Sequence, residues 1–199
     1  MGDGQPHKRK VPHRRAAIEK QAPCDDETLV MPADLAYGLA METDLTIRSA
    51  RPVDIAAMKA IWKEFIDFHM TRDPFFERCP DGHDRYGEFV AKHIRDADWC
   101  ILVAVADNEV VGQGIGTVQY YPPVYAHGRF GYIQEVAVTE AHRRRGIGTA
   151  LIERMTAWFK HHGITRVEVE VAAANEVSNS FWRKAGFGDF TARLSKKID

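Results

Sequence analysis

The stretch that decides the fold is Tyr132-Ile-Gln-Glu-Val-Ala-Val138, followed by a short turn that contains Arg143-Arg-Arg-Gly-Ile-Gly148 and then by an apolar pattern with helical spacing. A strand that feeds a cationic, glycine-containing turn at the start of a helix is suited to holding phosphate. The helix N-terminus offers unpaired N–H groups there, and glycine lets a ligand approach the backbone. Three consecutive arginines supply more charge than one pyrophosphate needs, so the segment predicts a polyanionic ligand.

The composition indicates a globular protein of ordinary domain size. The chain has 199 residues, 45% of them hydrophobic, and a net charge of −1. This charge gives no global field for nucleic acid or an anionic membrane, so neither partner is expected. Cys24, Cys79 and Cys100 show no metal or disulfide spacing, and the nine histidines show no paired-ligand spacing. We therefore expect no metal and a reducing, cytoplasmic location. No apolar run approaches the roughly 20 residues of a membrane span.

The chain divides into two parts. Residues 1–44 show no helix or strand periodicity, which predicts a disordered N-terminal extension, and residues 45–199 form the expected domain. Hydrophobic periodicity within the domain predicts the order β-α-α-β-β-β-α-β-α-β, with a last strand from Phe187. Gly112-Gln-Gly-Ile-Gly116 falls inside a β-rich run, where it predicts a bulge or a close backbone approach.

Spacing distinguishes among the families that use glycine turns. The Walker pattern requires Lys-Ser or Lys-Thr after its last glycine, and Thr149 follows Gly148 directly. The dinucleotide fingerprint matches in part, because Gly146-x-Gly148 opens a helix. However, Leu151 stands where that fingerprint needs a small residue, and seven residues separate Val138 from Gly146.

Two motifs resemble those of the GCN5-related N-acetyltransferases. Arg143-x-x-Gly146-x-Gly148 is similar to the family's acetyl-coenzyme A signature, and Asn175-x-x-Ser178-x-x-Phe181-Trp182-x-x-x-Gly186-Phe187 is similar to its closing motif. The resemblance covers roughly residues 45–194. It implies an α/β fold with a mixed, mostly antiparallel sheet flanked by helices. In that fold the central strand pair splays, which here would separate residues 135–138 from residues 166–172.

The resemblance also implies how acetyl-coenzyme A is bound. Its pyrophosphate would lie on the turn, and its pantetheine would pair with the exposed strand edge, where a backbone N–H near Val136 to Val138 would polarise the thioester carbonyl. Three positions of the closing motif match residues that line the cofactor in relatives. The implied cofactor-binding residues are Val136, Ala137, Val138, Arg143, Arg144, Arg145, Gly146, Ile147, Gly148, Thr149, Asn175, Ser178 and Trp182.

Glu135 is the first candidate for the catalytic base, because many relatives carry an acid at this place in the strand. An equally open interpretation is that Glu135 orders the site or binds a cationic substrate, and Tyr132 is a weaker candidate base. The family's frequent general-acid tyrosine would fall at Trp182, whose indole does not protonate a thiolate usefully. Tyr120, Tyr121 or solvent would then supply that proton.

The sequence thus predicts an acetyl-coenzyme A-dependent N-acetyltransferase that moves an acetyl group, by direct attack, to a primary amine of a small molecule or peptide. The competing hypothesis is a non-catalytic acyl-coenzyme A-binding sensor or assembly module, which would share the cofactor turn. A homodimer is compatible with either function, and the sequence does not identify the acceptor amine.

Overall fold

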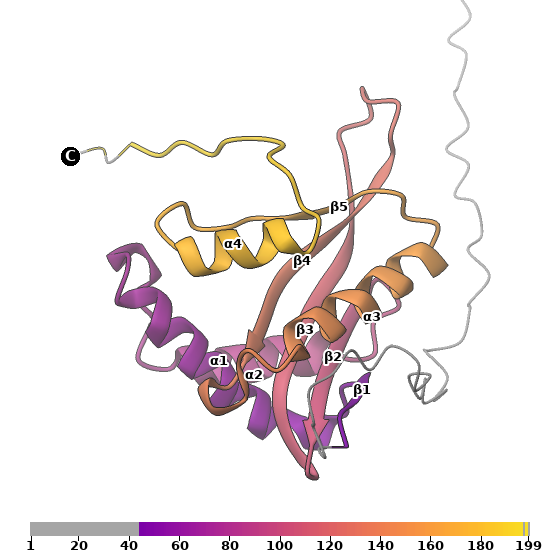
Figure 1. The fold of residues 1–199 in the computed structure, drawn as a ribbon. Helices are drawn as coiled ribbons and strands as arrows, with labels where there is room; N and C mark the ends of the chain where they lie inside the picture. The colour runs from indigo at the N-terminus through magenta and orange to yellow at the C-terminus, as the bar shows by residue number, and fades with distance from the viewer. Residues whose placement is uncertain (1–43, 197, 199) are drawn as a thin grey trace, which may run out of the picture.

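A five-stranded sheet with helices on both faces forms the part of the chain that this computed structural model describes, residues 44–196 and 198 (Figure 1). The strands are β1 (Thr46–Ser49), β2 (Trp99–Ala106), β3 (Glu109–Tyr120), β4 (Arg129–Val138) and β5 (Val167–Val169). The α-helices are α1 (Ile55–Met70), α2 (Gly82–His93), α3 (Ile147–His161) and α4 (Glu176–Lys184). Short 3-10 turns are η2 (Pro52–Asp54), η3 (Pro74–Phe76) and η4 (Glu140–His142). The predicted N-terminal extension lies, apart from Asp44, outside the described residues.

The sheet follows the order of the chain, β1-β2-β3-β4-β5. The first four strands pair antiparallel, whereas β5 joins β4 in parallel. This parallel pairing covers only Gly131–Ile133 of β4 and Val167–Val169 of β5. Within the described residues, no strand pairs with this side of β4 from residue 134 to Val138. The mixed, mostly antiparallel sheet is therefore confirmed, and its parallel pair separates after three residues.

The two faces of the sheet carry different helices (Figure 1). Helix α3 covers one face, and its Leu151, Met155 and Phe159 are fully buried. The apolar positions of α3 recur at helical spacing, so one side of the helix faces the sheet. Helices α1 and α2 cover the other face, where Met58 and Val90 are fully buried. The hydrophobic core thus lies in two layers, one on each side of the sheet.

Glycines in β3 let α3 lie close to the sheet. A Cβ at Gly114 would lie 2.9 Å from Met155 Sδ, and a Cβ at Gly116 would lie 2.9 Å from both Met155 Cε and Phe159 Cζ. Any larger side chain would therefore push the helix away. The close backbone approach predicted for this run is confirmed.

A β-bulge interrupts β4 at Gln134. Ile115 of β3 pairs with Glu135, whereas the next residue, Gly116, pairs with Ile133, so Gln134 is the extra residue. A bulge bends the strand and redirects the side chains that follow it. Here it leaves Gln134 exposed and turns Glu135 toward the face that α1 and α2 cover.

The prediction of a last strand from Phe187 is wrong. Residues 187–196 form no strand in the described part of the chain, and Phe190 and Leu194 are 56% and 92% exposed. Residues 189–195 do alternate polar and apolar side chains, but the apolar ones, Phe190, Ala192 and Leu194, are all exposed, so no part of the core covers that side. Side-chain contacts hold it instead, because Arg193 pairs with Glu170 and Arg166 lies over the ring of Phe190.

No helix in the described residues is both long and apolar enough to cross a membrane.

Candidate active site

Glu135 belongs to a largely buried hydrogen-bonded network between β3, β4 and α2 and is itself partly buried. Tyr86 Oη donates to Glu135 Oε1 at 2.6 Å, and Gln113 Nε2 donates to the same oxygen at 2.6 Å. Gln113 Nε2 also donates to Tyr86 Oη at 2.7 Å. Gln113 is fully buried and Tyr86 is 8% exposed, so water competes little for these bonds. The network fixes one oxygen of Glu135, while Oε2 accepts no hydrogen bond from the described residues.

Burial raises the pKa of Glu135 from 4.5 to about 7, although the hydrogen bonds from Tyr86 and Gln113 act in the opposite direction. Loss of hydration disfavours the charged carboxylate, and donors favour it. A carboxyl with this pKa is populated in both protonation states near neutral pH. Such a group both accepts and releases a proton readily, as acid–base catalysis requires.

Tyr86, which lies on α2, connects this network to α1. Its ring stacks on Trp62 of α1, with centroids 4.9 Å apart and an interplanar angle of 16°. Burial and the neighbouring Glu135 carboxylate raise the pKa of Tyr86 far above its usual range. The hydroxyl therefore keeps its proton and acts as a donor to Glu135.

Glu64 of α1 braces the turn between β4 and α3. Its Oε1 accepts from Arg143 Nη2 at 2.6 Å and from the backbone N–H of Glu140 at 2.8 Å. Arg143 Nε also donates to the carbonyl of Val138 at 3.0 Å. The side chain of Arg143 thus holds the turn together, whereas Arg144 and Arg145 are exposed.

Gly146 is the N-cap of α3 and has the left-handed conformation, with φ of 78°. No described atom lies within 4 Å of the position that its Cβ would occupy. With no side chain to cap the helix, the N–H groups of its first turn have no acceptor within the helix. Open space, free donors and the positive end of α3 together form a cradle for an anion.

Gly148 lies close to α4. A Cβ at this position would lie 3.0 Å from Phe181 Cζ of α4. The missing side chain therefore makes room for α4. Its backbone N–H still belongs to the first turn of α3.

The three predicted residues of the closing motif occupy different environments. Asn175, 2% exposed, caps α4 by accepting from the backbone N–H of Ser178 at 3.1 Å. Asn175 Nδ2 lies 3.4 Å from His69 Nε2, so the cap also contacts α1. Ser178 is half-buried. Trp182 is 7% exposed and packs in the core with its ring edge-on to Phe187, with centroids 5.1 Å apart.

The tyrosines considered as proton donors or bases differ in their partners. The Tyr121 hydroxyl donates a hydrogen bond to Glu168, so its proton is directed at that carboxylate. Tyr120 is 61% exposed at the end of β3. Burial and the Glu170 carboxylate raise the pKa of Tyr132, which keeps it protonated and argues against its use as a base.

Sequence reasoning missed Tyr86, Gln113 and Glu64. Tyr86 lies in α2 and Glu64 in α1, and neither carries a local signal of its partner. Gln113 did carry a signal, since a polar amide inside a β-rich, glycine-containing run must find a buried partner. Within residues 44–196 and 198, no group of three or more His, Cys, Asp or Glu side chains is arranged to hold a metal ion.

Comparison with known proteins agrees with this geometry. The pattern of the acetyltransferase (GNAT) family matches residues 62–187. The chain is 29% identical over 116 residues to an N-alpha-acetyltransferase of Sulfurisphaera tokodaii, which covers 54% of this chain and 66% of the relative. It is 28% identical over 104 residues to an aminoglycoside N(6')-acetyltransferase of Acinetobacter haemolyticus, which covers 49% of this chain and 70% of the relative.

A solved structure shows the same fold. The aminoglycoside N-acetyltransferase AAC(6')-Iy, in complex with coenzyme A, superposes with a TM-score of 0.62 at 15% identity and covers 80% of this chain and 98% of its own. The comparisons favour an enzyme and give no support to a sensor without activity. With a family pattern that spans more than half of its length, the chain belongs to the acetyltransferase (GNAT) family of acyltransferase enzymes.

Proposed function

We propose that this protein is an N-acetyltransferase that moves the acetyl group of acetyl-coenzyme A directly to a primary amine of a small molecule or peptide, with Glu135 as the base. One observation carries this proposal: Glu135 has a pKa of about 7 and a fixed Oε1, and lies on the strand that separates from β5. The reducing, cytoplasmic location predicted from the cysteines belongs to the same proposal.

The residues of the turn fit a pyrophosphate. Gly146 leaves open space at the start of α3, and the exposed Arg144 and Arg145 add positive charge. Arg143 would support the turn through Glu64 and contact the ligand mainly through its backbone. The residues that would hold the cofactor are Val136, Ala137, Val138, Arg143, Arg144, Arg145, Gly146, Ile147, Gly148, Thr149, Asn175, Ser178 and Trp182.

Acetyl-coenzyme A would supply an activated thioester carbonyl. Glu135 would take a proton from the substrate ammonium, and the free amine would then attack the carbonyl carbon. With an amine pKa near ~10.4, deprotonation at neutral pH costs roughly 4 kcal/mol, which a nearby base offsets in part. A backbone N–H of Val136, Ala137 or Val138 would stabilise the negative oxygen that forms on attack. As the carbonyl re-forms, the carbon–sulfur bond would break and the nitrogen would lose its second proton to solvent.

The proton for the departing thiolate would come from solvent. Trp182 is buried in the core, and Tyr121 donates to Glu168. A coenzyme A thiolate is a fair leaving group, so the step does not require a dedicated acid.

Thiol release from acetyl-coenzyme A in the presence of a panel of amines and peptides tests the proposal. We expect saturable release with at least one primary amine and 1:1 binding of acetyl-coenzyme A by calorimetry. Tight binding without release from any amine would contradict the proposed reaction.

The turn is tested separately with Arg145→Ala, and Arg95→Ala of an exposed arginine outside the turn is the matched control. Arg145→Ala should weaken acetyl-coenzyme A binding by about 1–3 kcal/mol, more at low salt than at high salt, because the contact is ionic. Equal acetyl-coenzyme A affinities of the two variants would show that Arg145 does not contact the cofactor.

A further inference from the structure

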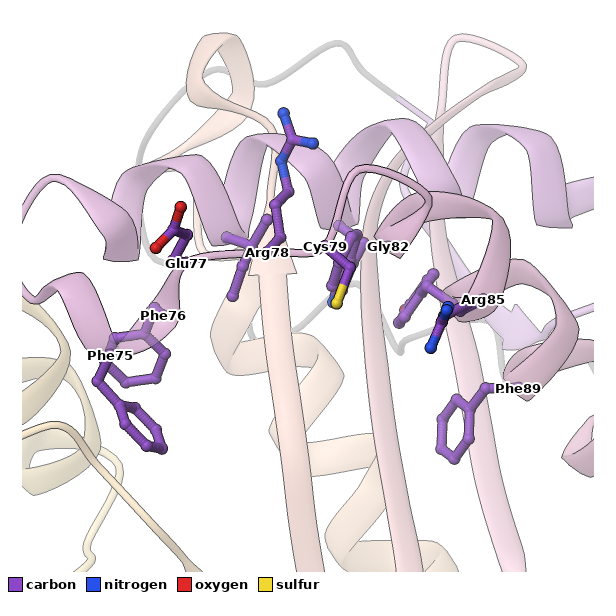
Figure 2. A pocket seen from close by; sticks show the side chains of 11 residues that line it. Phe75, Phe76, Glu77, Arg78, Cys79, Gly82, Arg85 and Phe89 are labelled. Atoms are coloured by element: carbon purple, nitrogen blue, oxygen red, sulfur yellow. The ribbon is translucent and has the colours of Figure 1, made fainter.

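An open pocket lies between α1, α2 and the loop that joins them, on the face of the sheet that holds Glu135 (Figure 2). Its volume is about 450 Å³, a size at which small-molecule sites are commonly found. Aromatic side chains dominate its lining: Trp62, Phe75, Phe76, Tyr86 and Phe89. Phe75 contacts Phe76 edge-on but is 84% exposed, which leaves most of its apolar surface open to solvent.

The charged groups of the lining are mostly neutralised by their neighbours. Arg78 pairs with Asp67 at 2.9 Å, and Arg85 pairs with Asp81 at 2.8 Å. Figure 2 shows the Arg78 guanidinium pointing away from the rings of Phe75 and Phe89. Glu77 is exposed and forms no ion pair with the described residues, so the uncompensated charge of the lining is negative. A cation with an apolar body suits this pocket better than an anion does.

Tyr86 is the one lining residue of the pocket that contacts the candidate base, and Glu135 itself does not line the pocket. The ring of Tyr86 lines the pocket and stacks on Trp62, while its hydroxyl donates to Glu135 at 2.6 Å. An acceptor whose amine lies beside Glu135 would therefore carry its remaining atoms toward these rings. Aromatic rings prefer stacked or edge-on partners, and the existing pairs Trp62–Tyr86 and Phe75–Phe76 show both arrangements.

We propose that this pocket binds an aryl group that a short chain joins to the primary amine of the acceptor. The inference rests on the proposed function, because it names the substrate class of the same site. An aryl-binding pocket disfavours acceptors that are hydrophilic throughout. Their hydroxyl groups would lie against the aromatic rings without hydrogen-bond partners.

Matched amines test the preference. We expect kcat/KM for β-phenethylamine to exceed that for ethylamine by about 10- to 100-fold, the value of burying a phenyl group. The dipeptides Phe-Gly and Gly-Gly distinguish an N-terminal aromatic residue from a free arylalkylamine. Phe75→Ala should reduce the aryl preference by about 3- to 10-fold. Phe190→Ala, which removes an exposed ring outside the pocket, should leave the preference unchanged.

Cys79 gives a measurement that needs no turnover. It is exposed and lines the pocket, whereas Cys100 is buried. With desulfo-coenzyme A present, which lacks a thiol, β-phenethylamine should slow the alkylation of Cys79 by iodoacetamide, as read by peptide mapping. Ethylamine at the same concentration should not slow it, and Phe75→Ala should weaken the protection.

The outcomes separate the two proposals. Acetyl transfer without any aryl preference, or equal protection of Cys79 by both amines, would overturn the pocket assignment and leave the transferase standing. Absence of transfer to every amine, with Cys79 still protected by β-phenethylamine alone, would overturn the proposed reaction and leave the aryl site standing.

Discussion

The two faces of the sheet are built in opposite ways. Under α3 the packing is apolar and close: a Cβ at Gly131 would lie 2.6 Å from the ring of the fully buried Phe159. Under α1 and α2 the same sheet carries a carboxyl and an amide, Glu135 and Gln113, which bond to each other and to the phenol of Tyr86 on α2. One face is therefore packed for stability, whereas the other holds a partly buried ionisable group, Glu135.

The polar groups on the Glu135 face are energetically unfavourable where they lie. Burial raises the pKa of Glu135 to about 7, so the protein holds a carboxylate less well than water does. The Oε1 atom of Gln113 is also buried without a hydrogen-bond partner within the described residues. Functional sites commonly carry such unfavourable groups, and structural faces rarely do. The comparison therefore predicts that changes on the α3 face alter stability, whereas changes on the Glu135 face alter chemistry.

The largest expected effect is on turnover. Glu135→Gln should lower kcat by about 10²- to 10⁴-fold and leave acetyl-coenzyme A affinity nearly unchanged, because the amide keeps the shape but does not accept the proton. The loss should shrink as pH rises toward the pKa of the amine. Steady-state kinetics with Glu88→Gln, an exposed acid on α2, provides the control. A raised KM with unchanged kcat would instead make Glu135 a substrate-binding anion.

The same substitution should increase stability at neutral pH. The raised pKa of Glu135 means that its contribution to stability is fully present below about pH 4.5 and is lost as pH rises through about 7. Glu135→Gln should therefore be more stable than the wild type above pH 7, by on the order of 2–3 kcal/mol, with the difference vanishing near pH 4. Urea unfolding at several pH values measures this. If Glu135→Gln were less stable than the wild type at every pH, the Glu135 carboxylate would be well solvated in the folded protein.

On the α3 face, Gly131→Val should lower the free energy of unfolding by about 1–3 kcal/mol, because the new side chain overlaps the ring of Phe159. Gly128→Val is the matched control, since no described atom lies within 4 Å of its Cβ position. Chemical denaturation of both variants tests the prediction. Equal midpoints would mean that α3 shifts easily and that this face is not close-packed.

The sequence predicted the parts of the fold that depend on local periodicity. The apolar pattern from Ile147 to Phe159 and the terminating Gly163 specify α3, because a helix that buries one side repeats every 3.6 residues. The strand before the turn and the amphipathic α1 and α2 follow in the same way. The expected last strand failed although residues 189–195 alternate polar and apolar side chains, because the apolar side chains stay exposed and no neighbouring strand pairs with the segment in the described chain.

The candidate site was predictable only in part. Glu135 and the turn could be named from motifs, but the partners of Glu135 could not, because Tyr86 lies 49 residues away in the chain. Their contact depends on the bulge at Gln134, which tertiary packing sets and no local pattern shows. Likewise, the brace from Glu64 to Arg143 joins residues 79 apart. Such contacts follow from the assembled sheet and not from any one segment.

The smallest effect should come from Tyr86→Phe, which sharpens the comparison within the Glu135 face. The ring and its stacking on Trp62 remain, but Glu135 loses one donor. Because that donor favours the carboxylate, the pKa of Glu135 should rise further, and the acid limb of kcat/KM should move upward by about 0.5–1 unit. Stability should fall by only about 0.5–1.5 kcal/mol. Tyr125→Phe, an exposed tyrosine outside the network, is the control in the same pH profile. An acid limb that stays in place would show that the titrating base is not Glu135, since no other change in this variant would compensate for the lost hydrogen bond.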